Sequence, residues 1–265
     1  MRNRLAVLMK QDNENIMNNF MTRLKQRELL LGTMLSLPSP ETAEIISHCG
    51  FDWLFLDGEH SPASVLDWQR VMQAVGGRSA CMLRVPVNSE VHIKKALDIG
   101  ADGIIVPMIN SAKQASDAVA WSHYSPQGCR GIGPGRASRY GKNLAAYIER
   151  ANEDLALILQ IEHIDAVTNI DEIVNVEGVD ALFIGPSDLS ASMGKTGQLD
   201  DVEVCAAMDK VADACRQRKL PLGYFGMTAT SVEPFIAAGY SLICAGTDAD
   251  FVTRGALQMV TALTP

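Results

Sequence analysis

Positive charge is scarce in this sequence. The 265 residues include 31 acidic and 23 basic side chains, which gives a formal net charge of −8. Proteins that bind nucleic acid neutralise its phosphates with clustered Lys and Arg, so this balance argues against a nucleic-acid partner. An anionic small molecule would need a few arginines held together locally.

Long apolar runs and paired cysteine motifs are also missing. No apolar stretch approaches the roughly 18–20 residues that cross a bilayer, and the run at 5–9 is too short for the core of a signal peptide. The six cysteines are scattered without a C-x-x-C motif, which is typical of free thiols in a reducing compartment. We therefore expect no membrane association and a cytoplasmic location.

The common nucleotide-binding and serine-hydrolase motifs are absent as well. The sequence contains neither a Walker motif nor G-x-S-x-G. GIGPG at 131–135 is only a fragment of a dinucleotide loop, because it neither follows a predicted strand directly nor opens a helix. None of the lysines falls at the end of a predicted strand, so nothing marks a lysine for Schiff-base chemistry.

What the chain does contain is a regular alternation of apolar runs and helical patterns. Hydrophobic residues make up 47% of it, which is ample for a large core. The apolar runs lie at 30–35, 53–56, 80–85, 103–106, 155–161, 181–184, 220–225 and 241–245. Eight such runs alternating with helices predict a closed (β/α)8 TIM barrel of parallel strands. We expect one domain over 1–265, with 1–17 as an N-terminal extension.

Two local features support the barrel and point to its active end. Gly-x-Asp recurs directly before three of the apolar runs, at 50–52, 100–102 and 178–180, as expected for an iterated unit. The longest irregular stretches lie at 125–143 and 185–198. Because barrel enzymes build their sites from the loops that follow strands, both stretches are site candidates.

Carboxylates stand at the ends of two neighbouring predicted strands. Glu162 follows the run at 155–161, and Asp188 follows the run at 181–184. Two carboxylates at the same end of adjacent parallel strands can share a hard divalent cation such as Mg²⁺ or Mn²⁺. Either carboxylate is equally suited to cap a helix N-terminus. His163 is a weaker second candidate for a metal ligand.

Two further strand ends carry polar side chains. Asp57 closes the run at 53–56, and His60 follows three residues later. A carboxylate bonded to one imidazole nitrogen leaves the other free as a base, although a solvated loop with a capping Asp is the simpler alternative. Arg84 closes the next run and either receives an anionic ligand or forms an ion pair with Asp57 or Glu162. Four such strand ends in one barrel predict a shared site.

The longer motifs around these residues resemble the HpcH/HpaI family of metal-dependent pyruvate aldolases. They are FDWLFLDGEH at 51–60, LRVP at 83–86, GCRG at 128–131, RASR at 136–139, QIE at 160–162 and VEGVDALFIGPSDLS at 176–190. The resemblance runs from about residue 20 to the C-terminus. It implies a barrel of the phosphoenolpyruvate/pyruvate type whose last helix is swapped between subunits of a homo-oligomer, a trimer or a hexamer.

The resemblance also assigns residues to metal and substrate. Glu162 and Asp188 are expected to bind Mg²⁺ or Mn²⁺. Arg84 is expected to hold pyruvate, with Gln160 beside the metal site. Backbone N–H groups around Ser187 and Asp188 are expected to receive the pyruvate carboxylate.

The remaining implied roles concern proton transfer and the neighbouring subunit. His60, oriented by Asp57, resembles the acid–base pair of the family. Asp98 matches an Asp that reaches the site of an adjacent subunit, although from the residues alone it is equally a solvent-facing helix residue. Together these roles imply reversible cleavage of a 4-hydroxy-2-oxo acid to pyruvate and an aldehyde.

Two alternatives remain. An acyl-CoA lyase of the citrate-lyase β type would need a basic surface for nucleotide phosphates, and no Lys/Arg cluster obviously supplies one. A non-catalytic barrel would be expected to have lost the site residues. The loop at 131–136 is shorter and richer in Pro and Gly than in the dicarboxylate-semialdehyde aldolases that it otherwise resembles, which leaves the aldehyde open. Arg136 and Arg139 either bind a distal carboxylate or sugar hydroxyls of the substrate or pair with acids at a subunit interface.

Overall fold

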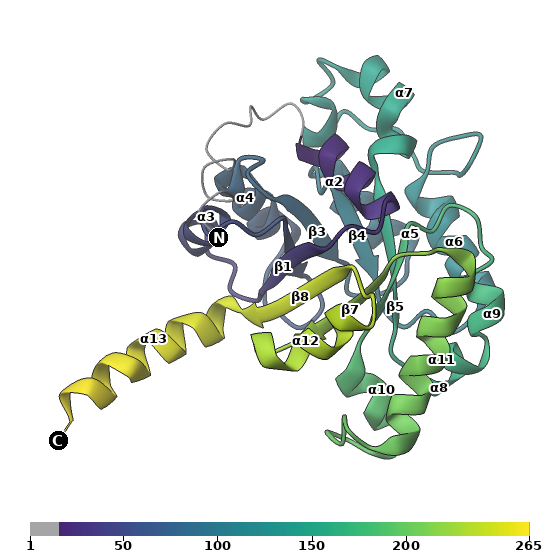
Figure 1. The fold of residues 1–265 in the computed structure, drawn as a ribbon. Coiled ribbons are helices and arrows are strands. Elements are labelled where there is room, and N and C mark those ends of the chain that lie inside the picture. Colours follow the sequence, from purple (N-terminus) through teal and green to yellow (C-terminus); the bar gives the residue numbers. More distant parts are fainter. Residues whose placement is uncertain (1–15, 265) are drawn as a thin grey trace.

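Eight parallel strands close into a barrel in the computed structural model, which describes residues 16–264 (Figure 1). The strands are β1 (Leu30–Leu35), β2 (Trp53–Asp57), β3 (Ala80–Arg84), β4 (Gly103–Val106), β5 (Ala156–Ile161), β6 (Ala181–Ile184), β7 (Leu222–Gly226) and β8 (Leu242–Thr247). Each strand pairs with the next in the chain, and β8 pairs with β1. The predicted (β/α)8 barrel is confirmed.

Helices alternate with these strands. They are α2 (Ile16–Lys25), α3 (Pro40–Ser47), α4 (Val65–Val75), α5 (Glu90–Asp98), α6 (Ala112–Ser122), η1 (Arg136–Ser138, a 3-10 turn), α7 (Leu144–Asp154), α8 (Ile164–Thr168), α9 (Ile170–Ile173), α10 (Pro186–Ser192), α11 (Val202–Arg218), α12 (Ala229–Ala237) and α13 (Asp248–Leu263). Helix α2 begins two residues inside the predicted extension at 1–17, whose first fifteen residues lie outside the described part of the chain.

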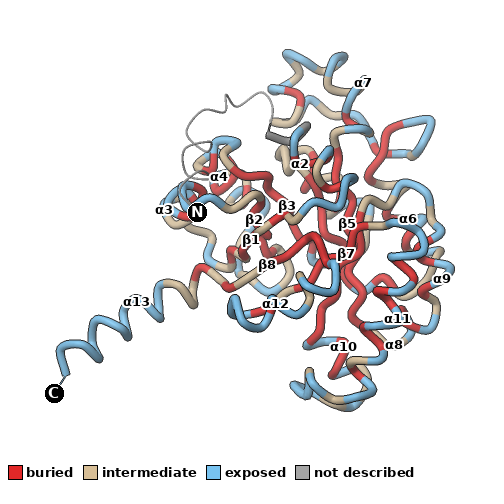
Figure 2. The backbone as a smooth tube through the Cα atoms, viewed as in Figure 1, coloured by how far each residue is buried: buried red, intermediate tan, exposed pale blue. Residues whose placement is uncertain are grey.

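The barrel interior is filled with side chains. In β2, Trp53 and Phe55 point inward and meet the ring of Phe183 from β6, whereas Leu54 packs outward against the surrounding helices. This alternation follows from the strand period of two. Figure 2 shows the buried strands at the centre of the molecule. A filled interior leaves only the ends of the barrel for ligands.

Helix α2 closes the N-terminal end of the barrel. Its Phe20, Met21 and Leu24 are buried and belong to the same cluster as the inward-facing strand residues. The C-terminal end of the strands is the open one.

The Gly-x-Asp turns share one structural role. Asp52, Asp102 and Asp180 directly precede β2, β4 and β6, and each carboxylate accepts the main-chain N–H of the opposite residue on the preceding strand. The donors are Leu31, Cys81 and Leu157, at 2.8, 2.8 and 2.9 Å. The aspartates therefore fix the strand register at the N-terminal end of the barrel. Burial raises the pKa of Asp102 and that of Asp180 to about 6.

The two long loops lie at opposite ends of the barrel. The stretch at 185–198 follows β6 and begins with α10, a helix that the sequence pattern did not predict. The stretch at 125–143 follows α6, a helix rather than a strand. There Arg136 donates to the carbonyl of Ile99 at 2.9 Å, just before β4 begins. The prediction that this loop belongs to the strand-end site of its own barrel is wrong.

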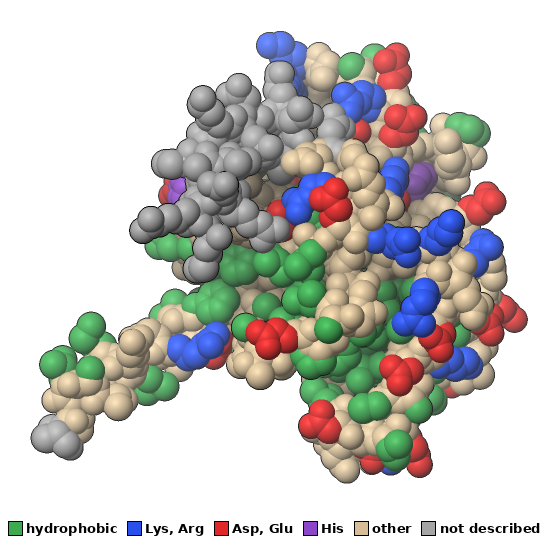
Figure 3. Space-filling view, viewed as in Figure 1, with side chains coloured by type: hydrophobic (Ala, Val, Ile, Leu, Met, Phe, Trp, Pro, Cys, Tyr) green, Lys and Arg blue, Asp and Glu red, His purple; other side chains and the backbone are tan. Residues whose placement is uncertain are grey.

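The C-terminal helix α13 projects away from the barrel (Figure 1). It is anchored at its first residue, Asp248, whose carboxylate accepts the N–H groups of Ser36 and Leu37 at 3.0 and 2.9 Å. Phe251 still stacks on Phe51, with ring centroids 6.4 Å apart. The larger apolar side chains after Phe251 are exposed; they are Val252, Leu257, Met259, Val260 and Leu263. Figure 3 shows apolar side chains along the arm.

Among the described helices, none combines the length and the apolar character needed to cross a membrane. The cytoplasmic location stays a prediction.

Candidate active site

A buried ion pair joins two strand ends at the open end of the barrel. The parallel register places Asp57, the last residue of β2, directly beside Arg84, the last residue of β3. Nε and Nη2 of Arg84 donate to Oδ1 of Asp57 at 3.0 and 2.8 Å. The exposed fractions of the two side chains are 6% and 5%. Of the alternatives for Arg84, the ion pair with Asp57 is therefore present.

Glu59 is a further site residue, which lies inside the LDGEH motif and has no role among the predicted site residues. Its Oε2 is 3.1 Å from Nη1 of Arg84, so two carboxylates hold one guanidinium. Burial raises the pKa of Glu59, and the charge of Arg84 opposes that rise.

The relation between Asp57 and His60 differs from the expected one. Oδ1 of Asp57 accepts the main-chain N–H groups of Glu59 and His60 at 3.1 and 3.2 Å, as in an Asx-type turn. No hydrogen bond joins this carboxylate to the imidazole ring, which is 67% exposed and has its Nε2 3.9 Å from Glu59. Asp57 thus fixes the backbone that carries His60 and does not orient its ring.

Glu162 is a buried carboxylate at the end of β5. Its Oε1 accepts the N–H of Met108 at 2.7 Å, and its Oε2 accepts Nε2 of Gln160. Burial raises the pKa of Glu162 to about 7; the Met108 N–H opposes this, and the carboxylates of Glu59 and Asp188 add to it. A carboxylate with this environment favours either a proton or a cation near neutral pH.

Two unusual backbone positions, Met108 and Gly185, lie next to the Glu162 carboxylate. Met108 adopts φ of +54°, which is unusual for a residue other than Gly, and this residue supplies the N–H to the carboxylate. At Gly185, a Cβ atom would lie 2.9 Å from both Gln160 Nε2 and Glu162 Oε2. A side chain there would displace the Gln160 amide and the Glu162 carboxylate, so glycine suits this close approach.

Neither Glu162 nor Asp188 is the N-cap of a helix, which was the alternative to their role as metal ligands. The N-cap of α8 is His163, whose Nδ1 accepts the N–H of Asp165 at 3.1 Å, so this imidazole is a cap and Glu162 is not. The N-cap of α10 is Gly185, and Asp188 lies exposed in the first turn of that helix.

A cavity of about 140 Å³ opens among these groups. Its lining comprises Met34, Phe55, His60, Arg84, Gln160, Phe183, Gly185, Pro186, Ser187, Asp188 and Phe225. The predicted residues His60, Arg84, Gln160, Ser187 and Asp188 are thus brought together at one small cavity, with Asp57 and Glu162 behind them. The guanidinium of Arg84 lies over the Phe55 ring, 5.1 Å from its centroid, which fixes its plane further.

The oxygen atoms at this cavity fit a hard divalent cation. Glu162 and Asp188 supply carboxylates, and Oε1 of Gln160 is buried without a hydrogen-bond partner in the described structure. No group of three or more His, Cys, Asp or Glu side chains in the described residues forms a metal-binding cluster. Mg²⁺ commonly binds through one or two carboxylates and keeps several waters, whereas Zn²⁺ prefers His and Cys ligands.

Asp98 and the two loop arginines are not part of this cavity. Asp98, the last residue of α5, pairs with the buried Arg130 at 2.8 Å. Arg136 and Arg139 line a separate cavity of about 620 Å³ together with Arg130. Asp98, at the end of α5, and the loop arginines all lie at the N-terminal end of the barrel, so they do not contact the strand-end site of their own subunit.

A filled (β/α)8 barrel with carboxylates, an arginine and a histidine around a small cavity at the C-terminal end of its strands is the arrangement of a barrel enzyme. The family model described as HpcH/HpaI aldolase/citrate lyase matches residues 31–254. A hydroxypyruvate/pyruvate aldolase of Pseudomonas aeruginosa is 36% identical over 245 residues, covering 91% of each chain. This chain belongs to the HpcH/HpaI aldolase/citrate lyase family, and the predicted aldolase class is confirmed.

Solved structures agree with this assignment. An HpcH/HpaI aldolase/citrate lyase family protein from Burkholderia cenocepacia J2315 is 33% identical, with a TM-score of 0.89 over 93% of this chain and 99% of that one. A citrate lyase β subunit from M. tuberculosis, complexed with oxaloacetate and magnesium, has a TM-score of 0.57 and is 13% identical over 86% of this chain and 95% of that one. The second likeness extends only to the fold.

Proposed function

We propose that this protein is a divalent-metal-dependent aldolase that reversibly cleaves a 4-hydroxy-2-oxo acid into pyruvate and an aldehyde. The observation that carries the proposal is the convergence of Arg84, Asp188 and Gln160 on one small cavity, with Glu162 held behind it. The name of the Pseudomonas relative supports pyruvate as the 2-oxo acid.

Glu162 and Asp188 would hold Mg²⁺ or Mn²⁺, with Gln160 beside them. The bound cation would act as a Lewis acid toward the 2-oxo group of the substrate. The N–H groups of Ser187 and Asp188 lie in the first turn of α10, where no intrahelical acceptor is available. They would receive the C1 carboxylate of the substrate.

Arg84 would stabilise the negative charge that develops on the C2 oxygen when the C3–C4 bond breaks. Asp57 and Glu59 hold its guanidinium in one orientation before substrate arrives, so little reorganisation is needed. His60 lines the cavity and would take the proton of the C4 hydroxyl as the aldehyde leaves. Its exposed ring suits repeated exchange of that proton with solvent.

The exposed side chains of α13 support a homo-oligomer, a trimer or a hexamer, in which this helix packs on another subunit. Apolar side chains along an arm with no intramolecular partner in the described structure favour such burial. Asp98 is 29% exposed at the N-terminal end of its own barrel. Its proposed catalytic role would therefore be exerted in the site of an adjacent subunit.

The acyl-CoA lyase alternative has weaker support. The M. tuberculosis citrate lyase β subunit is only 13% identical, against 36% for the hydroxypyruvate/pyruvate aldolase. A non-catalytic barrel would not be expected to keep a buried carboxylate such as Glu162 beside Asp188 and Arg84.

Retro-aldol cleavage tests the proposal. Adducts of pyruvate with succinate semialdehyde, tartronate semialdehyde and lactaldehyde would be supplied, and the pyruvate released would be followed through lactate dehydrogenase. EDTA should abolish release, and Mg²⁺ or Mn²⁺ should restore it. Glu162→Gln should abolish the restored activity, whereas Glu153→Gln, an exposed position on α7, should not. Trapping of a pyruvate Schiff base by borohydride would contradict the mechanism.

A further inference from the structure

Ser241 occupies the position before β8 that Asp52, Asp102 and Asp180 occupy before β2, β4 and β6. At all four positions the main-chain N–H donates to the carbonyl of the opposite residue on the preceding strand. For Ser241 that residue is Leu222, at 3.0 Å. The three aspartates each place a carboxylate at the start of the preceding strand, whereas Ser241 places a neutral hydroxyl there.

The Ser241 hydroxyl is buried and unsatisfied. Ser241 is 4% exposed, and its Oγ has no hydrogen-bond partner in the described part of the chain. Its main chain is held on both sides, because its carbonyl also accepts the N–H of Leu30 at 2.7 Å. Ser79, which directly precedes β3, is different: its hydroxyl donates to the carbonyl of Phe51 at 2.8 Å. A buried hydroxyl without a partner is uncommon and needs an explanation.

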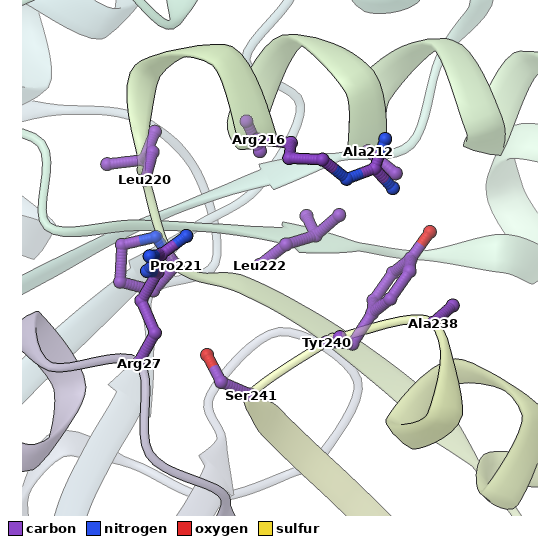
Figure 4. Close-up of a pocket in the computed structure, with 11 residues that line it drawn as sticks. Arg27, Ala212, Arg216, Leu220, Pro221, Leu222, Ala238, Tyr240 and Ser241 are labelled. Carbon is purple, nitrogen blue, oxygen red and sulfur yellow. The ribbon is translucent and has the colours of Figure 1, made fainter.

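The hydroxyl points into a cavity of about 150 Å³ at the N-terminal end of the barrel. Figure 4 shows Ser241 Oγ directed toward the space that the guanidinium of Arg27 enters from the turn before β1, with Arg216 on α11 across from them. The described residues that line this cavity include two guanidinium groups and no carboxylate.

The two arginines have charge available for a ligand. Arg27 forms no ion pair within the described residues and adopts φ of +56°, a conformation that usually favours Gly. Arg216 pairs with Asp213, but both side chains are more than 60% exposed, so solvent screens this pair. Asp209 also lies close enough to act on Tyr240, and neither acid lines the cavity.

Stabilisation of helix C-termini by the two arginines explains only part of this arrangement. Arg27 and Arg216 both lie at helix C-termini, where cations stabilise the free carbonyls. That accounts for their charge, but it does not account for the unsatisfied hydroxyl between them or for the missing carboxylate.

We propose that this cavity binds a small tetrahedral oxyanion of the phosphate class, which takes the place of the carboxylate that Ser241 lacks. The Ser241 hydroxyl would donate to one oxygen, and the guanidinium groups of Arg27 and Arg216 would donate to the others. The cavity volume of about 150 Å³ is several times the minimum of about 10–15 Å³ that one water molecule needs. This admits inorganic phosphate or one phosphoryl group and is below the roughly 300 Å³ of pockets for larger organic ligands.

The site is independent of the proposed aldolase function, because it lies at the opposite end of the barrel from Arg84 and Glu162. An oxyanion there would join α2, α11 and the starts of β7 and β8, so it is expected to stabilise the fold. The probe is sodium phosphate, titrated into the full chain at constant ionic strength balanced with sodium chloride. Unfolding temperature and calorimetric binding are the measurements.

The wild type should unfold at a higher temperature in phosphate than in chloride. The double variant Arg27→Gln/Arg216→Gln should bind phosphate about 100-fold less tightly, since each of the two charged hydrogen bonds contributes about tenfold. Arg70→Gln is the matched control, because Arg70 pairs with Asp67 three residues before it as Arg216 pairs with Asp213. It should leave phosphate binding unchanged.

Ser241→Asp supplies the missing carboxylate covalently. This variant should be more stable than the wild type without phosphate and should no longer respond to it. Ser241→Ala should bind phosphate about tenfold less tightly, whereas Ser79→Ala should keep the full response. An anomalous selenate signal beside Ser241 in crystals would place the anion directly.

Three results would overturn the proposal. One is an equal effect of chloride and phosphate on the wild type, as a water-filled cavity predicts. Another is an unchanged phosphate response in Arg27→Gln/Arg216→Gln. The third is loss of the response in Arg84→Lys instead, which would place the anion in the candidate active site.

Discussion

Arg84 directs two of its nitrogens, Nε and Nη2, to a single oxygen of Asp57, at 3.0 and 2.8 Å. The same oxygen accepts the main-chain N–H groups of Glu59 and His60. One carboxylate oxygen therefore links the end of β3, the end of β2 and the loop that carries the candidate base. The geometry of the arginine and the position of His60 depend on the same atom.

Removing Asp57 is expected to destabilise the fold through Arg84. Asp57→Ala leaves the guanidinium buried with only Glu59 as an anionic partner, which should lower the free energy of unfolding by about 3–5 kcal/mol. Arg84→Met added to Asp57→Ala removes the buried charge and should recover part of that loss. Urea unfolding of the two single variants and the double variant measures the coupling. Strictly additive losses would show that the two side chains do not depend on each other.

Arg84→Lys keeps the charge and loses the planar fork. A lysine cannot bond Asp57 and Glu59 in the same geometry, so the position of the cation at the cavity becomes less defined. We expect kcat/KM for pyruvate release to fall by about tenfold or more, with a smaller loss of stability than in Asp57→Ala. Arg78→Lys is the control, because Arg78 is also a partly buried arginine and donates to Ser47, away from the cavity. Unchanged kcat/KM in Arg84→Lys would contradict the assigned role.

Metal affinity is expected to depend on pH through Glu162. Burial raises the pKa of this carboxyl to about 7, so at pH 6 a cation must displace a proton that is mostly absent at pH 8. The apparent Mn²⁺ affinity should therefore rise with pH, by about tenfold per unit well below pH 7, and level off above it. Calorimetry in buffers of different ionisation enthalpy would show the released proton. An affinity that is constant between pH 6 and 8 would exclude this linkage.

Much of the fold was predictable because the barrel repeats one unit. Continuous apolar runs such as 103–106 can only be buried strands or short buried helices, and eight of them in alternation leave few topologies. The strand-end rule then placed Asp57, Arg84, Glu162 and Asp188 on one side. Local motifs alone sufficed for that step, because all parallel strands share their direction.

What the sequence pattern could not settle depends on contacts between distant segments. The stretch at 125–143 is predicted at the active end because it is long and comes after the fourth apolar run. Its contact with Ile99 through Arg136 shows that it lies at the other end. Likewise, the Asp57 carboxylate had several partners within reach, and only the register of β2 against β3 directs it to Arg84. Glu59 was overlooked because its side chain acquires a role only when Arg84 arrives from the next strand.

The buried register aspartates are expected to make stability depend on pH. Burial raises the pKa of Asp102 from 3.8 to about 6. Between these values the folded protein holds a proton that the unfolded chain has lost, so stability falls as pH rises through this window. In Asp102→Asn this contribution disappears. Between pH 4 and pH 7, the free energy of unfolding of the variant should therefore rise by about 2–3 kcal/mol relative to that of the wild type. Urea unfolding at the two pH values measures this difference.

A control for that comparison is available on the surface. Asp213→Asn alters an exposed carboxylate on α11 and should leave the pH dependence of the wild type in place. If Asp102→Asn and Asp213→Asn show the same pH profile, Asp102 is not the titrating group.

The arm formed by α13 is expected to decide the oligomeric state. Met259 and Leu263 lie one turn apart, and their exposed fractions are 63% and 76%, so both can be changed without disturbing the barrel. Met259→Glu/Leu263→Glu places charges on the surface that would face another subunit, and the complex should dissociate toward smaller species. Light scattering after size exclusion measures the mass. Ile45→Glu, at an apolar side chain of α3 that is 67% exposed, should not change it. An oligomer of unchanged mass in the α13 variant would show that another surface holds the subunits together.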